Sequence, residues 1–330
     1  MYTDIPLWVS ITFVVVGLAA LAWSSDAFVD GASTVAKALG ISPFIIGMVI
    51  IGFGTSAPEL CVSVMSGLSG HSNLSLGNAY GSSIFNIAVI LGVAALISPS
   101  VVKPSISFVA APVLALITGF SMFVLRDGFC SRVEALILLG AFLVILPGYC
   151  WFDQKFGSAQ KDESSTAANK NVVVAVLKLV VGLAVLMGSS HILVWGSVDL
   201  ARAMGVSELL IGLTIVSIGT SLPELASAVV SARRGEHEFV LGNIVGSNLF
   251  NTLAVVGLAG SVCPIGNFSP YVLSRDLPLM LGLSISITIM GTNWKHLKEN
   301  GVVARTEGAI WVFVFIAYTA LMICQEMQPK

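Results

Sequence analysis

The sequence contains few charged residues. Asp, Glu, Lys and Arg make up 10% of the 330 residues, against roughly 25% in an ordinary soluble domain. The formal net charge is −2, and no basic tract occurs that would favour binding to nucleic acid. We therefore expect neither a nucleic-acid-binding protein nor a soluble enzyme.

Paired cysteines and a signal peptide are also lacking. The five cysteines are scattered, mostly within apolar runs, and no CxxC pair occurs. We interpret them as small buried hydrophobic side chains. The N-terminal MYTDIPLWVSITF has no basic n-region, so we expect the first apolar run to be retained as a helix.

Long apolar runs fill the rest of the chain. Hydrophobic residues make up 56% of it, and runs of about 20 residues are long enough to cross a bilayer core. This composition predicts an all-α polytopic membrane protein. The ten expected spans are approximately 5–28, 42–69, 74–97, 105–125, 133–152, 172–198, 207–232, 239–262, 275–291 and 307–325.

The chain contains two copies of one unit. An offset of 165 residues aligns 46–92 with the second half without a gap, and 20 of the 47 positions are identical. We therefore divide the chain into a first five-helix repeat at 1–152, a cytoplasmic linker at 153–170 and a second repeat at 171–330. Because five is odd, the second copy is expected to be inverted, as in many secondary transporters with a site at the midplane.

Basic residues in the predicted loops give the orientation. With the N-terminus outside, ten loop lysines and arginines lie inside and five lie outside. The excess of basic residues inside predicts a multi-pass protein of the cell (inner) membrane with both termini extracytoplasmic.

The same short motif interrupts one span in each copy. It reads GTSAPEL in the first half and GTSLPEL in the second. Pro58 and Pro223 lack an N–H and break the helix, while Gly54 and Gly219 tolerate unusual backbone torsions. Broken backbone survives at membrane depth only where it lines a cavity or meets a ligand.

Each motif also carries a carboxylate, Glu59 in the first copy and Glu224 in the second. A charge at bilayer depth costs at least about 2.5–3.5 kcal/mol, so a bound cation is expected to offset it. Together with the carbonyls of Thr55 and Thr220, the two carboxylates supply six oxygens, the lower end of the range that calcium takes. Like charges raise each other's proton affinity when the cage is empty, so calcium, sodium or protons must fill it, and exchange is the expected outcome.

A second motif, GNAYGSSIFN, returns as GNIVGSNLFN. Its glycines at 77, 81, 242 and 246 are four residues apart, which favours close helix packing. Its polar side chains share one helix face, which we expect to point at the glutamates. These residues are Asn78, Ser82 and Asn86 in the first copy and Asn243, Ser247 and Asn251 in the second. Either motif alone is compatible with packing, but two duplicated motifs with an acid in each copy favour a functional site.

Asp26 and His191 coincide under the same offset. We interpret both as solvated residues near the ends of the first helix of their repeat. The alternative is that they help to gate the protein or sense pH.

On these paired motifs the chain resembles the calcium/cation antiporter superfamily, the family of sodium/calcium exchangers, and above all its small prokaryotic members. The resemblance implies ten transmembrane helices in two inverted halves, with helices two, three, seven and eight around the ions and helices one and six sliding against them. Its implied ion ligands are Glu59, Glu224, Thr55, Ser56, Thr220, Ser221, Gly52, Ser217, Ser82, Asn86, Ser247 and Asn251.

One departure from the family pattern concerns the counter-ion. Sodium/calcium members carry an aspartate at one of the two positions held here by Asn86 and Asn251. With two formal charges instead of three, the resemblance leaves a proton/calcium antiporter open as the alternative to a sodium/calcium antiporter. A cation channel or a non-transporting membrane protein is the alternative of another class.

The predicted function is secondary active exchange of calcium for sodium by alternating access. We expect no enzymatic activity and no cofactor. The expected partners are the transported ions and the lipid bilayer, without nucleic acid or an obligate protein partner.

Overall fold

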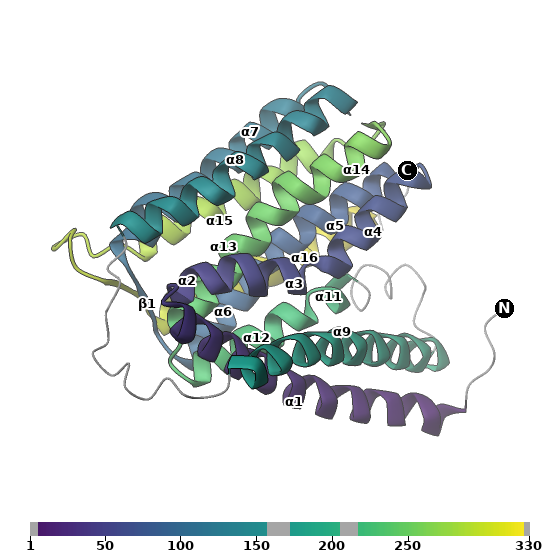
Figure 1. The fold of residues 1–330 in the computed structure, drawn as a ribbon. Helices are drawn as coiled ribbons and strands as arrows, with labels where there is room; N and C mark the ends of the chain where they lie inside the picture. The colour runs from purple at the N-terminus through teal and green to yellow at the C-terminus, as the bar shows by residue number, and fades with distance from the viewer. Residues whose placement is uncertain (1–5, 157–171, 205–216, 327–330) are drawn as a thin grey trace.

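The chain folds into a helical molecule with two short strand pairs (Figure 1). A computed structural model describes residues 6–156, 172–204 and 217–326. The elements of the first half are α1 (Leu7–Leu39), α2 (Pro43–Ile46), η1 (Gly47–Ile51), α3 (Gly52–Thr55), α4 (Ala57–Leu68), α5 (Ser72–Phe85), η2 (Asn86–Leu91), α6 (Gly92–Ile97), β1 (Ser100–Val102), η3 (Ile106–Ala110), α7 (Ala111–Leu125), β2 (Phe129–Cys130) and α8 (Arg132–Phe156). Those of the second half are α9 (Val172–Ala203), α11 (Ser217–Gly219), α12 (Leu222–Arg233), α13 (His237–Leu249), η6 (Phe250–Val255), α14 (Val256–Val262), β3 (Ile265–Gly266), η7 (Val272–Asp276), α15 (Leu277–Met290), β4 (Gly301–Val303) and α16 (Arg305–Glu326), where η denotes a π-helical segment.

Most of these helices have the length and composition of membrane spans. Among the described residues, eight helices are long and apolar enough to cross a membrane, and a broken pair, Pro43–Thr55 with Ala57–Leu68, brings the number to nine. The predicted span at 207–232 lies partly outside the described residues, which resume at α11. The predicted linker at 153–170 does so too, and α8 extends into its first residues.

Large apolar side chains face outward from these helices. Trp8, Val144 and Phe313 expose 69%, 72% and 70% of their surface, respectively. Contiguous apolar exposure of this kind suits a lipid environment, where apolar surface needs no cover from water.

The first helix is longer than its apolar run predicts. α1 continues to Leu39 and ends where Gly40 adopts φ 63°, with its N–H bonded to the carbonyls of Ala36 and Lys37. The prediction that Asp26 lies near a helix end is therefore wrong, and His191 likewise lies well inside α9. Hydropathy failed here because it reports the thickness of the apolar layer rather than the length of the helix.

The helices divide into a long pair and a larger group. α1 and α9 pack along one another on one side of the molecule, at the bottom of Figure 1. The remaining helices form the larger group, and α13 lies within it, with every residue of 239–249 buried. Its apolar side chains belong to the main core, so the polar residues of its GNIVGSNLFN motif also lie in the interior.

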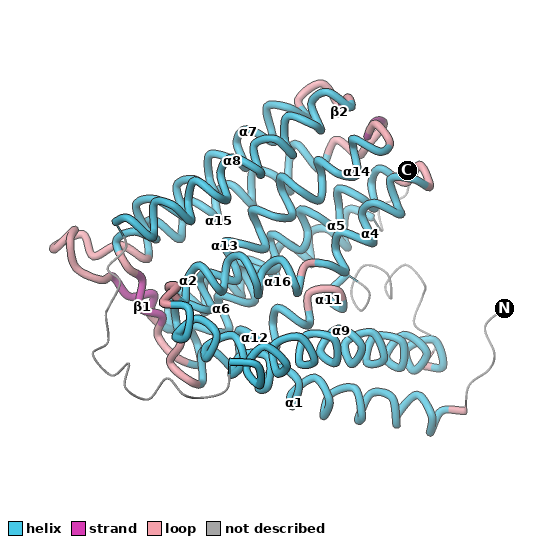
Figure 2. The backbone as a smooth tube through the Cα atoms, viewed as in Figure 1, coloured by secondary structure: helices cyan, strands magenta, loops and turns pink. Residues whose placement is uncertain are grey.

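Two antiparallel strand pairs connect the halves of the chain (Figure 2). β1 pairs with β4, so that Ser100 lies opposite Val303. β2 pairs with β3, so that Phe129 lies opposite Gly266. Each pair joins the segment after the α6 or α14 helix of one half to a segment before the last helix of the other half.

An ion-pair cluster ties α1 to the turn between α12 and α13. The Arg234 guanidinium donates to the Asp26 carboxylate and carbonyl and lies 3.9 Å from Asp30 Oδ1. Lys178 Nζ of α9 donates to Asp30 Oδ2 at 2.8 Å. Asp26, whose side chain is 63% exposed, is thus solvated as predicted but also paired.

Candidate functional site

The two proline motifs break their helices as the sequence predicts. α3 ends at Thr55 and α4 begins at Ala57, with Ser56 between them at φ −85° and ψ 6°. The two segments are bent by 45°. In the second half, Ser221 takes the same conformation, φ −93° and ψ 8°, at the start of α12. Pro58 and Pro223 lie in the first turns of α4 and α12, where the N–H that proline lacks is not needed.

The two carboxylates are buried and are bound crosswise between the halves. Glu59 is 0% and Glu224 is 1% exposed. Ser56 Oγ donates to Glu224 Oε1 at 3.0 Å, and Ser221 Oγ donates to Glu59 Oε1 at 2.9 Å. Because the offset of 165 residues exchanges these two bonds, they place the two motifs face to face around a common centre.

Each carboxylate keeps one oxygen without a partner. Glu59 Oε2 and Glu224 Oε2 are buried and accept no hydrogen bond from the described residues. A buried polar atom without a partner is costly, and a carboxylate oxygen in that position is a ready ligand for a cation.

Neighbouring hydroxyl groups also approach the carboxylates. The side chains of Thr55 and Thr220 lie against Glu224 and Glu59, respectively. Ser82 Oγ lies 3.5 Å from Glu59 Oε1 and 3.2 Å from Ser221 Oγ. Predicted ligands from both repeats therefore gather at one place.

Close packing between η1 and α13 brings Ser247 to the site. A Cβ at Gly246 would lie 2.2 Å from the Met48 carbonyl oxygen, and a Cβ at Gly242 would lie 2.2 Å from that of Phe44. At this approach Ser247 Oγ donates to the Gly52 carbonyl at 3.4 Å. For the second-half glycines, the predicted close packing is confirmed. The positions that the repeat places opposite Gly77 and Gly81 fall at 209 and 213, outside the described residues.

The two asparagines that replace a family aspartate differ in their contacts. Asn86 Nδ2 donates to Asn248 Oδ1 at 3.3 Å, and Asn86 Oδ1 has no partner among the described residues. Both polar atoms of Asn251 are buried and unpaired within the same part of the chain. Asn248 was not predicted; the signal was its place in the second motif, where the first copy has Ser83.

The other two asparagines of the predicted polar face do not bind the carboxylates. Asn78 Nδ2 donates to the Glu59 carbonyl at 3.0 Å and to Ser63 Oγ at 2.9 Å. Asn243 Nδ2 donates to Ser227 Oγ at 3.3 Å. Both therefore join the helices of one repeat, because their amides meet backbone and serine groups first. Ser217 opens α11, and its side chain is outside the described set.

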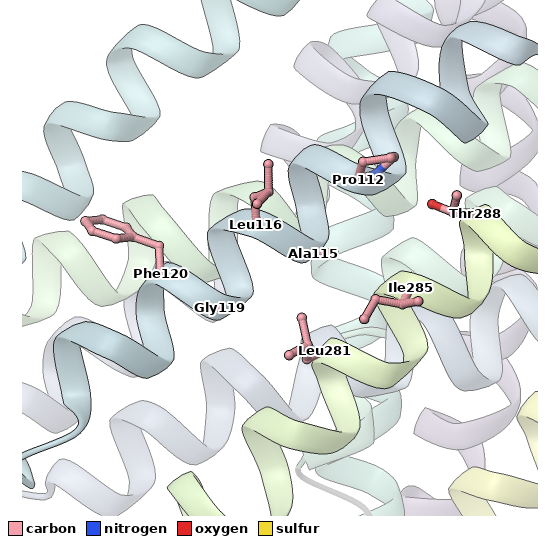
Figure 3. Close-up of a pocket in the computed structure, with 8 residues that line it drawn as sticks. All are labelled: Pro112, Ala115, Leu116, Gly119, Phe120, Leu281, Ile285 and Thr288. Carbon is pink, nitrogen blue, oxygen red and sulfur yellow. The ribbon is translucent and has the colours of Figure 1, made fainter.

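A separate groove between α7 and α15 holds none of the predicted ligands. It has a volume of about 690 Å³ and apolar walls (Figure 3). The lining residues are Pro112, Ala115, Leu116, Gly119, Phe120, Leu281, Ile285 and Thr288. It offers no charge to a cation.

The arrangement suits a transported cation better than a resident metal. Within the described ranges, no group of three or more His, Cys, Asp or Glu side chains is placed to hold a metal. The site instead offers two carboxylates surrounded by neutral hydroxyl, amide and carbonyl oxygens. Hard cations take such oxygen ligands, and a limited charge allows their release.

The chain is similar to known exchangers over nearly its whole length. The family model described as sodium/calcium exchanger protein matches residues 9–148 and 174–324. The putative antiporter CaxA of Alkalimonas amylolytica is 38% identical over 95% of this chain and 98% of its own. The inner membrane protein YrbG of Escherichia coli (strain K12) is 34% identical over 93% and 95%.

A solved structure shares the fold. The sodium-calcium exchanger NCX_Mj, soaked with 2.5 mM Na+ and 10 mM Sr2+, superposes with a TM-score of 0.82 and 28% sequence identity, and the match covers 96% of this chain and 99% of that one. With a family model matched across both halves and relatives above 30% identity along its length, this chain is a membrane protein that belongs to the sodium/calcium exchanger family of antiporters.

Proposed function

We propose that the protein is a secondary active antiporter that exchanges calcium for sodium at the site between Glu59 and Glu224. One observation carries the proposal. Two buried carboxylates from the two halves are each bound on one oxygen by a serine of the opposite half, and each leaves its second oxygen unpaired. Two negative charges balance one calcium ion, and sodium ions replace it from the opposite side.

The proposed ligands extend the two carboxylates with neutral oxygens. Thr55, Ser56, Thr220, Ser221 and Ser82 surround them, and Gly52, Ser217, Asn86, Ser247 and Asn251 complete the proposed set. The unpaired Oδ1 atoms of Asn86 and Asn251 support their inclusion, because an amide oxygen is a good ligand for a hard cation.

The proposed architecture is ten helices in two inverted repeats. The π-helical segments recur near the same places in both halves, η2 with η6 and η3 with η7. The strand pairs β1–β4 and β2–β3 also correspond when the halves are exchanged. These recurrences support division into repeats at 1–152 and 171–330. We further propose that the linker at 153–170 is cytoplasmic and that both termini are extracytoplasmic, in the cell membrane.

Relatives support sodium as the counter-ion. The protein MaX1 of Methanosarcina acetivorans, 28% identical over 95% of this chain, is named a sodium/calcium exchanger, as is NCX_Mj. The two asparagines, Asn86 and Asn251, favour the second candidate, proton/calcium exchange, because they lower the charge that sodium ions would have to balance.

Flux into proteoliposomes separates the candidates. We expect an imposed sodium gradient to drive calcium uptake while the pH gradient is collapsed. Uptake driven only by a pH gradient would establish the proton alternative. Calcium flux that depends on neither gradient would indicate a channel.

Substitution tests the site itself. We expect Glu59→Gln and Glu224→Gln each to lower exchange by about 100-fold or more, because one buried charge of a pair is removed. Glu299→Gln makes the same chemical change in an exposed loop and is expected to leave exchange unchanged. Normal exchange by either site variant would refute the proposed site.

A further inference from the structure

The α1–α9 pair is packed symmetrically. A Cβ at Gly17 would lie 2.9 Å from Leu193 Cβ, and a Cβ at Gly182 would lie 2.9 Å from Phe28 Cα. The offset of 165 residues turns the first contact into the second. The same relation links the contact of Gly31 with Leu179 to that of Gly196 with Val14. Exchanging α1 and α9 therefore leaves the packing within the pair unchanged.

The contacts of this pair with the two proline motifs are not symmetric. A Cβ at Gly54 would meet Leu183 at 2.8 Å, and a Cβ at Gly219 would meet the side chain of Val194. Both partners belong to α9. The repeat equivalents on α1 are Val29 for Gly54 and Leu18 for Gly219, and Leu18 is 51% exposed. A symmetric pair thus docks on the motifs through only one of its helices.

A hydrogen bond follows the same asymmetry. Pro223 has no N–H, so the Gly219 carbonyl lacks its helical donor, and Ser190 Oγ of α9 donates to that carbonyl at 2.9 Å. In the first half Pro58 leaves the Gly54 carbonyl in the same position. Its equivalent donor, Ser25 Oγ, is buried and has no partner among the described residues.

We propose that Ser190 and Ser25 are positioning residues that alternately cap the carbonyls freed by the two prolines, one in each access state. The proposal rests on the alternating access of the proposed function. In the described state, α9 docks on both motifs and Ser190 binds Gly219. In the other state, α1 takes over these contacts and Ser25 binds Gly54. Since the packing within the pair is the same in both states, the bonds to the motifs decide the balance between them.

This arrangement predicts opposite effects for two chemically identical substitutions. Ser190→Ala removes a bond of the described state, so the population shifts toward the other state. Ser25→Ala removes a bond of the other state, so the population shifts toward the described one. The loss of one buried hydrogen bond corresponds to a change of about two- to tenfold in the ratio of the two states.

Distances between spin labels measure this ratio without requiring exchange. We would replace the five native cysteines and attach labels at Met65 of α4 and Val181 of α9, both exposed. Pulsed electron paramagnetic resonance on the full chain in lipid nanodiscs then gives the weight of each distance. We expect Ser190→Ala and Ser25→Ala to change the weights in opposite directions, and Ser190→Thr, which keeps the hydroxyl, to resemble the unsubstituted protein.

The proposal is overturned if both alanine variants shift the weights in the same direction, or if either leaves the distance distribution unchanged. A loss of packing unrelated to the carbonyls would produce the first result. Calcium flux by the same proteins is measured separately. A failure of calcium exchange with a normal shift in distances would count against the proposed function alone.

Discussion

Replacing Gly246 with alanine tests how closely α13 must approach η1. The added Cβ would lie 2.2 Å from the Met48 carbonyl oxygen, 2.7 Å from its Cα and 2.8 Å from its carbonyl carbon. All three atoms are backbone, so no side-chain rotation relieves the contact. An ordinary contact begins near 3.4 Å, so the two segments must separate by about 1 Å.

The expected cost follows from this separation. Forcing extra volume into a packed interface typically costs about 1–3 kcal/mol. The bond from Ser247 Oγ to the Gly52 carbonyl is already 3.4 Å long, and a further 1 Å breaks it. We therefore expect Gly246→Ala to lower both thermal stability and the rate of calcium exchange.

The assay compares this variant with Gly282→Ala. Gly282 is exposed on α15, and no described atom lies within 4 Å of its added Cβ. Stability is the temperature at which half of the detergent-solubilised protein stays monodisperse on size-exclusion chromatography. We expect a clear decrease for Gly246→Ala and none for Gly282→Ala, since alanine is the better helix former. Equal stability and equal exchange in the two variants would refute the reasoning.

Two further predictions concern charge. Asn251→Asp adds a third carboxylate to the site, so more monovalent ions are needed to balance it, and calcium efflux should depend more steeply on external sodium; an unchanged sodium dependence would contradict the charge count. Burial raises the pKa of Glu236, in the turn between α12 and α13, above its ordinary value of 4.5 although Ser33 and Arg234 oppose the shift. The folded protein therefore loses stability as pH rises through that raised pKa. Glu236→Gln should stabilise the protein at neutral pH, and the gain should vanish below about pH 4 in thermal unfolding; a gain independent of pH would refute the assignment.

The sequence predicted the meeting of the two motifs because their signals are local and duplicated. Glu59 and Glu224 are costly in an apolar run, and Pro58 and Pro223 break their helices wherever they occur. The crossed bonds from Ser56 and Ser221 follow once two equivalent segments face each other. The sequence was sufficient for this part of the site because each residue type imposes its own constraint.

Contacts between segments distant in sequence were not predictable in the same way. Asn248 carries no signal that it accepts a hydrogen bond from Asn86, because that bond depends on how α13 lies against η2. The predicted face of Asn78 and Asn243 failed for a related reason. Helical spacing places both residues beside the carboxylates, but Ser63 and Ser227 compete for the same amides. Such competition is decided by packing.

The ion pair of Arg234 with Asp26 has no counterpart at the other end of the molecule. Under the offset of 165 residues, Arg234 corresponds to Ser69 and Asp26 corresponds to His191. Duplication supplied two interchangeable orientations, and these later substitutions made them unequal in energy. A transporter built in this way has a resting orientation that surface charge selects, and ionic strength weakens that preference by screening. The direction in which the carrier waits for its ion is thus encoded outside the membrane, at residues that never contact the cargo.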